Sequence, residues 1–423
     1  MIKIVKADKE ARESVLREMR ARAAGVNREI TDTAEKIMED IGERGYTAVE
    51  EYSIKFDGSA PYELTHEDLE NAAGKCDPEL YKAMERAAEE IRDYQSRLVP
   101  KSMEWGVNQS SCLGQIVRGL DRVGLYVPGG KAAYPSTVLM TAIPARVAGT
   151  RELVMLTPPT ENLNVAVMAA AKIAGVDRVI AVGGVQAVAA VTYGAGFIPK
   201  VDKLVGPGNA YVTAGKRFAY GRIDIDMTAG PSEVLIIADD TAKAEFVAAD
   251  MLSQAEHDPL ASSILVTTSQ ALADRVRDEI ERLMEEASRR EIIKASIQDY
   301  GAILMCETLT EAAEIANEIA PEHLEIMTEN PRALLGCVRN AGAVFLGEYS
   351  PEPLGDYMAG PSHVLPTSGT ARFFSPLSVD SFLKKTSLIE YSKEDLQAVH
   401  RDIEIIAESE KLTAHARSIK VRF

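Results

Sequence analysis

The chain has 423 residues, 46% of them hydrophobic and 26% charged, which is the composition of a globular protein large enough for two or three domains. Its 47 basic and 64 acidic residues give a formal net charge of −17, which argues against a nucleic-acid-binding surface, because such surfaces draw their affinity from clustered Lys and Arg. No stretch reaches the roughly 18 apolar residues of a membrane-spanning helix, and residues 1–8 lack the features of a signal peptide. The 4 cysteines form no Cys-x-x-Cys pair. We therefore expect a soluble protein of the reducing cytoplasm.

The N-terminal part of the chain, up to about residue 100, has the pattern of consecutive helices. One of them opens at Asp77-Pro78-Glu79, and apolar residues recur at helical spacing as far as Leu98. From about residue 117 to 239 the chain instead alternates short β-branched runs with helical stretches. Strands are predicted at 122–127, 152–157, 178–182, 203–205 and 233–238, and helices at 136–148, 163–174, 186–193 and 210–220. This alternation predicts a parallel sheet with helices on both faces.

A second alternating region follows the first. Its predicted elements are a helix at 245–254, a strand at 263–267, a charged helical stretch at 273–289, a strand at 302–305, a helix at 311–319 and a strand at 343–346. Residues 347–376 are rich in Pro and Gly, and residues 393–419 have the pattern of a charged helical tail. The sequence therefore indicates a second α/β region followed by a helical C-terminus.

Three glycine-rich segments stand where a predicted strand meets a helix, at 128–131, 183–186 and 206–209. Backbone N–H groups at such a helix start favour an anion such as a pyrophosphate, although tight turns also need glycine for steric reasons alone. Neither the G-x-G-x-x-G dinucleotide fingerprint nor the nucleotide P-loop pattern is present. Any nucleotide cofactor must therefore bind in an incomplete or modified Rossmann-like crevice.

Two pairs of candidate functional residues lie at the ends of predicted elements. Gln254 and His257 are three residues apart at the end of a helix, so they share a face and could ligate a metal, with a helix cap as the alternative for His257. Glu322 and His323 follow a proline and suit general base chemistry, with an exposed turn as the alternative.

The Pro/Gly-rich segment and the tail hold further candidates. Asp356 and His363 lie in a long stretch with little hydrophobic patterning, which is more typical of a site than of a linker. Glu410 and His415 lie in the charged tail, where a solvated helix is the simpler interpretation. No H-E-x-x-H motif and no G-x-S-x-G elbow occurs, so the sequence supports neither a metalloprotease nor an α/β-hydrolase.

Taken together, these segments resemble the histidinol dehydrogenase family. The matching stretches are residues 121–131, 205–209, 229–233, 253–259, 320–325 and 342–370, in the same order along the chain. The resemblance covers most of the chain, from about residue 25 to 420. It implies a zinc- and NAD-dependent oxidation of L-histidinol through a bound aldehyde to L-histidine, the last steps of histidine biosynthesis.

The resemblance also implies roles for individual residues. The zinc ligands would be Gln254, His257, Asp356 and His415. Ser232, His323 and Glu410 would join those four ligands in binding histidinol, and Tyr126, Gln186 and Asn209 would contact NAD. Glu322 and His323 would be the catalytic pair, in which His323 takes the hydroxyl proton and Glu322 activates the water that adds to the aldehyde, while zinc orients the substrate.

The expected fold is α/β, with two Rossmann-like domains built on incomplete, mostly parallel sheets. We expect a helical N-terminal arm at 1–25, a first domain at 26–118 plus 234–378 that carries most of the metal and catalytic site, a second domain at 119–233 that contacts NAD, and a C-terminal tail at 379–423. By resemblance the protein is a homodimer in which this extended helical tail reaches the partner, so that Glu410 and His415 complete the neighbouring site. Two alternatives remain: a paralogue that oxidises another small polar alcohol, and a metal- or nucleotide-binding protein without turnover.

Overall fold

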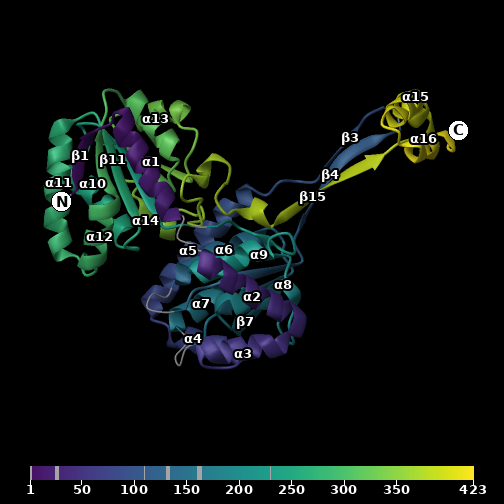
Figure 1. Ribbon diagram of the computed structural model, residues 1–423, viewed down its shortest axis with the longest axis horizontal. Helices are drawn as coiled ribbons and strands as arrows, with labels where there is room; N and C mark the ends of the chain where they lie inside the picture. Colours follow the sequence, from purple (N-terminus) through teal and green to yellow (C-terminus); the bar gives the residue numbers. More distant parts are fainter. Residues whose placement is uncertain (1, 24–27, 109, 130–133, 160–163, 229) are drawn as a thin grey trace.

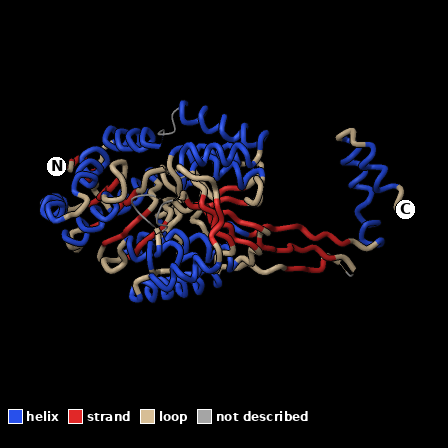
Figure 2. The backbone as a smooth tube through the Cα atoms, turned by 90° about the horizontal axis from the view of Figure 1, so that it is seen from below, coloured by secondary structure: helices blue, strands red, loops and turns tan. Residues whose placement is uncertain are grey.

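The protein consists of two α/β units and a long arm (Figure 1). The computed structural model describes residues 2–23, 28–108, 110–129, 134–159, 164–228 and 230–423. Each unit is built on its own six-stranded sheet, and a three-stranded ribbon leads away from them to a pair of helices at the C-terminus (Figures 1 and 2). None of the helices in these ranges is long and apolar enough to cross a membrane.

The first sheet is parallel throughout. Its strand order is β1 (Lys3–Lys6), β12 (Gly301–Met305), β11 (Ser262–Thr267), β10 (Glu233–Ala238), β13 (His323–Met327) and β14 (Ala343–Leu346). Helices α10 (Ala244–Ala255), α11 (Gln270–Glu286) and α12 (Arg290–Tyr300) cover one face, and α1 (Lys9–Ala23) and α13 (Leu309–Ile319) cover the other. Because both faces are covered, β10 is buried at every position, which explains its almost continuous apolar sequence.

The second sheet is parallel except for its first strand. Its order is β2 (Tyr62–Leu64), β7 (Arg178–Ala181), β6 (Glu152–Thr157), β5 (Arg122–Tyr126), β8 (Lys203–Val205) and β9 (Asp224–Ile225), and β2 is antiparallel to β7. One face is covered by α2 (Arg28–Arg44), α3 (Tyr46–Asp57), α8 (Gly184–Tyr193) and α9 (Ala210–Ala219). The other face is covered by α4 (His66–Lys75), α5 (Pro78–Arg97), α6 (Pro135–Val147) and α7 (Val165–Ala174).

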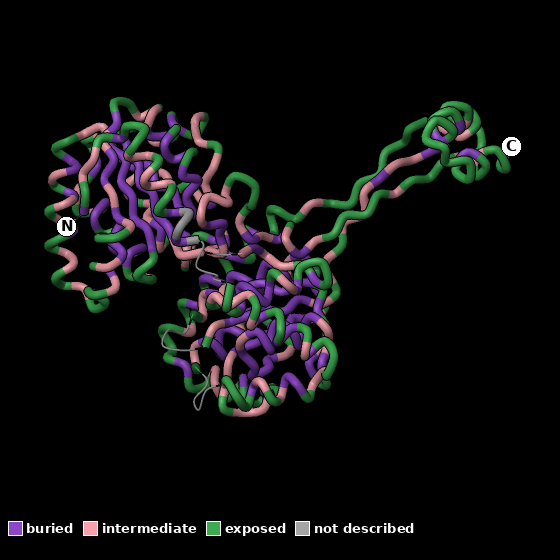
Figure 3. Tube along the Cα trace, viewed as in Figure 1, coloured by how far each residue is buried: buried purple, intermediate pink, exposed green. Residues whose placement is uncertain are grey.

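The arm is an antiparallel ribbon that carries the C-terminal helices. Its strands are β15 (Leu383–Glu390), β4 (Cys112–Gly119) and β3 (Met103–Gly106), and α15 (Lys393–Ser409) and α16 (Thr413–Lys420) lie at its far end (Figures 1 and 2). Most of the arm is exposed (Figure 3), including Trp105, Ile389 and Ile406, which are 50%, 71% and 59% exposed. So much apolar surface on a thin arm is typical of a segment that packs against another molecule.

The alternating pattern of the sequence is confirmed, because parallel strands and covering helices occur close to the predicted positions. The charged stretch predicted at 273–289 corresponds to α11, which ends at Glu286, and a further helix, α12, begins at Arg290 and was not predicted. Strands β1, β2, β9, β13 and those of the ribbon were not predicted. Four short helices, α14 (Glu352–Tyr357), η1 (Pro331–Cys337), η2 (Thr370–Arg372) and η3 (Val379–Phe382), lie in the segment that follows β13.

The packing of the N-terminal third corrects the predicted domain division. The prediction groups residues 26–118 with 234–378, but β2 pairs with β7, and α2 to α5 pack on the second sheet. Residues 1–25, predicted as a helical arm, begin with β1, which pairs with β12 at the edge of the first sheet. An amphipathic helix shows in its sequence that it has an apolar face, but not which sheet covers that face.

Candidate active site

A cavity of about 560 Å³ is lined by residues of both α/β units. The first unit contributes the amino ends of β10 and β13, with Ser232 directly before β10 and Glu322 directly before β13. The second unit contributes segments that follow the carboxyl ends of β5 and β8, including Pro128 and Gly206. Ligands of open α/β sheets usually bind at the carboxyl ends of the strands. Only the second unit follows that rule, whereas the catalytic candidates of the first unit stand at the opposite end of their strands.

The predicted catalytic pair is buried at this cavity and is held by the main chain of Glu233. Nδ1 of His323 donates to the Glu233 carbonyl at 3.0 Å, and the N–H of Glu233 donates to Oε2 of Glu322 at 2.9 Å. His323 and Glu322 are 3% and 6% exposed. Because Nδ1 must carry the proton to donate to a carbonyl, Nε2 of a neutral His323 is the basic nitrogen, and no part of the described chain donates a hydrogen bond to it. Nε2 is therefore the ring atom that would exchange a proton with a ligand in the cavity.

More carboxylates lie near His323 than its single positive charge could balance. Nε2 of its ring lies 3.9 Å from Oε1 of Glu352 and 3.8 Å from Oδ1 of Asp356. Burial opposes a positive charge on His323, but Glu322, Asp356 and Glu352 outweigh it and raise the pKa of the imidazole to about 10. Burial also raises the pKa of Glu322 to about 8. Without a metal, these carboxylates therefore keep His323 protonated near neutral pH. A cation bound beside them would offset their charge, lower the pKa of the imidazole and free Nε2 to act as a base.

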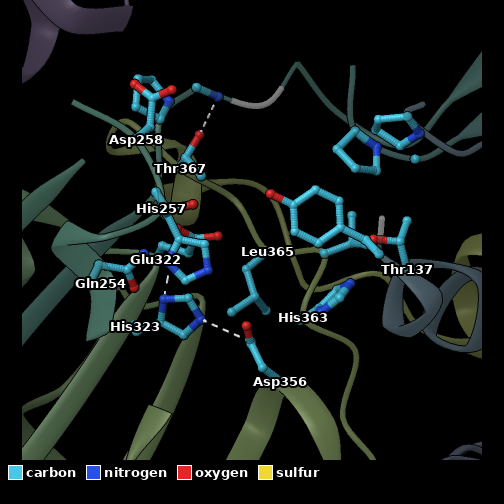
Figure 4. Close-up of a pocket in the computed structure, with 18 of the residues that line it drawn as sticks. Thr137, Gln254, His257, Asp258, Glu322, His323, Asp356, His363, Leu365 and Thr367 are labelled. Atoms are coloured by element: carbon cyan, nitrogen blue, oxygen red, sulfur yellow. Dashed lines mark hydrogen bonds and ion pairs between the residues drawn. The ribbon is translucent and has the colours of Figure 1, made fainter. Parts of the chain in front are cut away.

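Three of the four predicted zinc ligands gather around His323 in the same cavity (Figure 4). Gln254 is only 1% exposed, yet neither atom of its amide has a hydrogen-bond partner within the described ranges. A buried amide in this state costs free energy unless a ligand satisfies it. Nδ1 of His257 donates to the Ser253 carbonyl at 3.2 Å, which leaves Nε2 available to a metal. An imidazole nitrogen with the amide oxygen and the Asp356 carboxylate is a donor set that Zn²⁺ accepts, so these residues fit the metal.

The residues predicted to contact NAD lie at the carboxyl edge of the second sheet. The hydroxyl of Tyr126 accepts from the N–H of Gly184 at 3.1 Å, and Nε2 of Gln186 donates to Oδ2 of Asp57 at 3.0 Å. Asn209 caps α9 by accepting from two of its main-chain N–H groups.

The glycine segments do not all present free N–H groups to an anion, as the sequence suggested. The N–H of Gly183 donates to Asp57 at 3.2 Å, and the N–H of Gly206 donates to Asp226 at 2.8 Å. Gly130 and Lys131 of the segment at 128–131 lie outside the described residues. At 183–186 and 206–209, protein carboxylates therefore take hydrogen bonds that were predicted for a pyrophosphate.

Comparison with known proteins identifies the family of this site. The family model for histidinol dehydrogenase matches residues 20–423. The chain belongs to the histidinol dehydrogenase family. It is 50% identical to the histidinol dehydrogenase of Clostridium acetobutylicum, over 97% of this chain and 96% of that one, and 50% identical to that of Caldanaerobacter subterraneus, over 100% and 99%. The crystal structure of histidinol dehydrogenase from Elizabethkingia anophelis matches with a TM-score of 0.93 at 33% identity, covering 100% of this chain and 98% of that one.

This membership confirms the resemblance and the parallel α/β fold inferred from the sequence. Histidinol dehydrogenases are oxidoreductases that depend on NAD and zinc. The donor set around Gln254 and the carboxylates around His323 agree with that dependence on a metal.

Two residues predicted for the site lie far from it in the single chain. Glu410 follows α15 and His415 lies on α16, so both are at the far end of the arm, and both are exposed (Figure 1). One chain of this histidinol dehydrogenase family member therefore assembles Gln254, His257 and Asp356 without the fourth predicted ligand.

Four buried or half-buried residues of the site were missed in the sequence: Arg22, Asp57, Glu233 and Glu352. The available signal for Glu233 was a charged residue at the start of an otherwise apolar strand. The signal for Glu352 was its place one helical turn before Asp356, on the same side of α14. Arg22 and Asp57 carry no comparable local signal.

Proposed function

We propose that this protein oxidises L-histidinol through a bound aldehyde to L-histidine, with two NAD molecules accepting the two hydrides. One observation carries the proposal: the free Nε2 of His323 faces a cavity that also holds Glu322 and the donors Gln254, His257 and Asp356. An amino alcohol with an imidazole ring offers nitrogen atoms to a metal at those donors and a hydroxyl group to His323.

His323 acts as the first general base. Its Nδ1–H bond to the Glu233 carbonyl fixes the tautomer, so Nε2 takes the proton of the substrate hydroxyl as hydride leaves the carbon for NAD. Glu322 acts in the second oxidation by taking a proton from the water that adds to the aldehyde. Burial holds its pKa near 8, so the carboxylate is a base of useful strength close to neutral pH.

Gln254, His257 and Asp356 would hold the zinc ion on the first unit. When it is bound, zinc supplies a positive charge that orients the amino and imidazole nitrogens of the substrate. The second unit would hold NAD, the hydride acceptor, beside Tyr126 and Asn209. Gln186 supports that surface through its bond to Asp57.

The arm completes the site of a second subunit in this proposal. Glu410 and His415 are exposed at its end, and the apolar residues along it lack cover from their own chain. We infer a homodimer in which each arm lies on the other subunit and places His415 next to the Asp356 of that subunit.

Mixing two inactive variants tests the shared site. In a mixed dimer of His323→Ala with His415→Ala, one of the two sites has both an intact body and an intact arm. Random mixing should therefore restore about a quarter of wild-type activity, whereas sites completed within one chain would leave the mixture inactive.

Substrate preference tests the function itself. We expect kcat/KM for L-histidinol to exceed that of other amino alcohols by at least about 100-fold, because only histidinol brings both nitrogen ligands. A higher value for another small polar alcohol would identify a paralogue and overturn the assignment.

A further inference from the structure

The main chain of Glu233 holds both members of the catalytic pair. Its N–H group bonds to Glu322, and its carbonyl group bonds to His323. These groups belong to the peptide units on the two sides of one Cα atom, so the backbone angles of Glu233 set how the two side chains lie relative to each other. Glu233 stands at the end of the β10–β13 ladder, whose first pair is Val234 with His323. Whatever fixes Glu233 therefore also fixes the catalytic pair.

The side chain of Glu233 is fixed by Arg22 from the N-terminal segment. Nη2 of Arg22 donates to Oε1 of Glu233 at 2.5 Å, and the two side chains are 0% and 1% exposed. The N–H of Ser368 donates to the same oxygen at 2.9 Å, and Nη1 of Arg22 donates to the Leu260 carbonyl at 2.7 Å. Nε of Arg22 and Oε2 of Glu233 have no partner among the described residues, so these three bonds alone fix the ion pair. Removing one partner leaves an unpaired charge in a dry environment.

Arg22 reaches the cavity from outside the α/β repeats that supply the other residues. It lies one residue before the end of α1, and it lines the cavity together with Glu322 and His323. Helix α1 is attached elsewhere by a separate ion pair, in which Arg12 contacts Glu311 of α13. The attachment of the helix and its contact with the site are therefore made by different arginines.

We propose that Arg22 and Glu233 are positioning residues, whose ion pair holds the Glu233 backbone so that Glu322 and Nε2 of His323 face the reacting atoms together. The proposal rests on the proposed function, since it takes Glu322 and His323 as the reacting pair. A misplacement of about 1 Å in an active site can lower the rate by about 100-fold. Loss of the ion pair should therefore lower kcat far more than it changes KM.

The test compares two arginines on the same helix. Arg22→Gln should lower kcat by at least about tenfold and leave KM for histidinol within about twofold. Arg12→Gln, the matched control, removes the ion pair to Glu311 and should keep kcat within about twofold, even if both variants lose thermal stability. Arg22→Lys restores the charge beside Glu233 and should recover at least about a third of the lost activity. If Arg22→Gln fails to fold, Arg22→Lys becomes the test variant. Its kcat should then fall by less than the change expected of Arg22→Gln, while its KM for histidinol stays unchanged.

A second measurement reports the geometry without turnover. In ¹⁵N-histidine-labelled protein, the Nδ1 proton of His323 should give a slowly exchanging NMR signal in the wild type and in Arg12→Gln, and this signal should be lost in Arg22→Gln. An unchanged signal, a kcat of Arg22→Gln within about twofold of wild type, or an equal fall in Arg12→Gln would overturn the positioning role. Absence of NADH formation by the wild type would instead reject the proposed function, and the NMR comparison would still decide the role of Arg22.

Discussion

Replacing Gln254 by leucine should stabilise the metal-free protein. Both polar atoms of this amide are buried, and neither has a partner in the part of the chain that the structure describes. An unsatisfied buried polar group costs about 1–3 kcal/mol, and leucine fills a similar volume without that cost. We therefore expect the free energy of unfolding to rise by about 1–3 kcal/mol in the presence of a chelator, and Tm to rise by several degrees.

Zinc should reverse the order of stability of the wild type and Gln254→Leu. A metal present at about 100 times its Kd stabilises the wild type by about 2.7 kcal/mol. Gln254→Leu lacks one of the proposed ligands, so the same zinc concentration should stabilise it much less. Thermal unfolding with chelator and with zinc, followed by calorimetry, measures both effects.

A matched control separates the metal site from a general effect of removing a buried glutamine. Gln95 is 0% exposed, and its Oε1 accepts from the N–H of Val379 at 2.9 Å. Its Nε2 has no partner among the described residues. Gln95→Leu therefore removes one unsatisfied group but leaves the N–H of Val379 without its acceptor, and the free energy of unfolding should change by less than about 1 kcal/mol, equally with and without zinc. A metal-free Gln254→Leu less stable than the wild type, or an equal rise in the Tm of Gln254→Leu and the wild type with zinc, would contradict a metal-binding role for Gln254.

Three further predictions concern the loop that follows β8, the roles of His323 and Glu322, and the buried thiol of Cys306. Gly206→Ala should destabilise the second unit by several kcal/mol, because its Cβ would lie 2.2 Å from the main-chain oxygen of Tyr126. Gly221→Ala, where φ is +94° but the space around the Cβ is open, should lose only about 1 kcal/mol in urea unfolding, and equal losses in the two variants would contradict this. In single-turnover assays His323→Ala should slow the first hydride transfer by about 10²–10⁴-fold, and Glu322→Gln should slow the second more than the first; the reverse order would exchange the two roles. Burial raises the pKa of the Cys306 thiol to about 11, so mass spectra should show that Cys306 of the folded protein resists alkylation at pH 8. The stabilisation that comes from the neutral thiol should be lost as pH rises from about 8.5 to 11, and rapid labelling of Cys306 in native protein would contradict this.

The sequence predicts those elements whose residues share one environment along their length. The strand at β10 and its neighbours could be placed because both faces of the sheet are covered, so apolar residues run without interruption. The strand β13 was missed because its buried face carries His323 and Glu325, which read as polar loop residues. The ribbon strand β15 was missed because it is exposed along most of its length, so no apolar alternation marks it.

The site could be predicted only where local pattern or family resemblance reached it. Gln254 and His257 share a helix end, so spacing alone suggested a pair of ligands. The composition of its own segment made Asp356 a candidate, but only the resemblance could join it to this pair from about a hundred residues away. The contact of Arg22 with Glu233 spans a sequence separation of 211 residues and depends on how α1 packs beside the first sheet. No local rule connects such partners.

The yield of NADH per histidinol consumed tests the central claim most directly. With purified, zinc-loaded protein and excess NAD, a limiting amount of L-histidinol should give two NADH and one histidine, because in the proposed mechanism the Glu322–His323 pair serves both oxidations in one cavity. A yield of one NADH with accumulation of the aldehyde, or no NADH at all, would contradict the account.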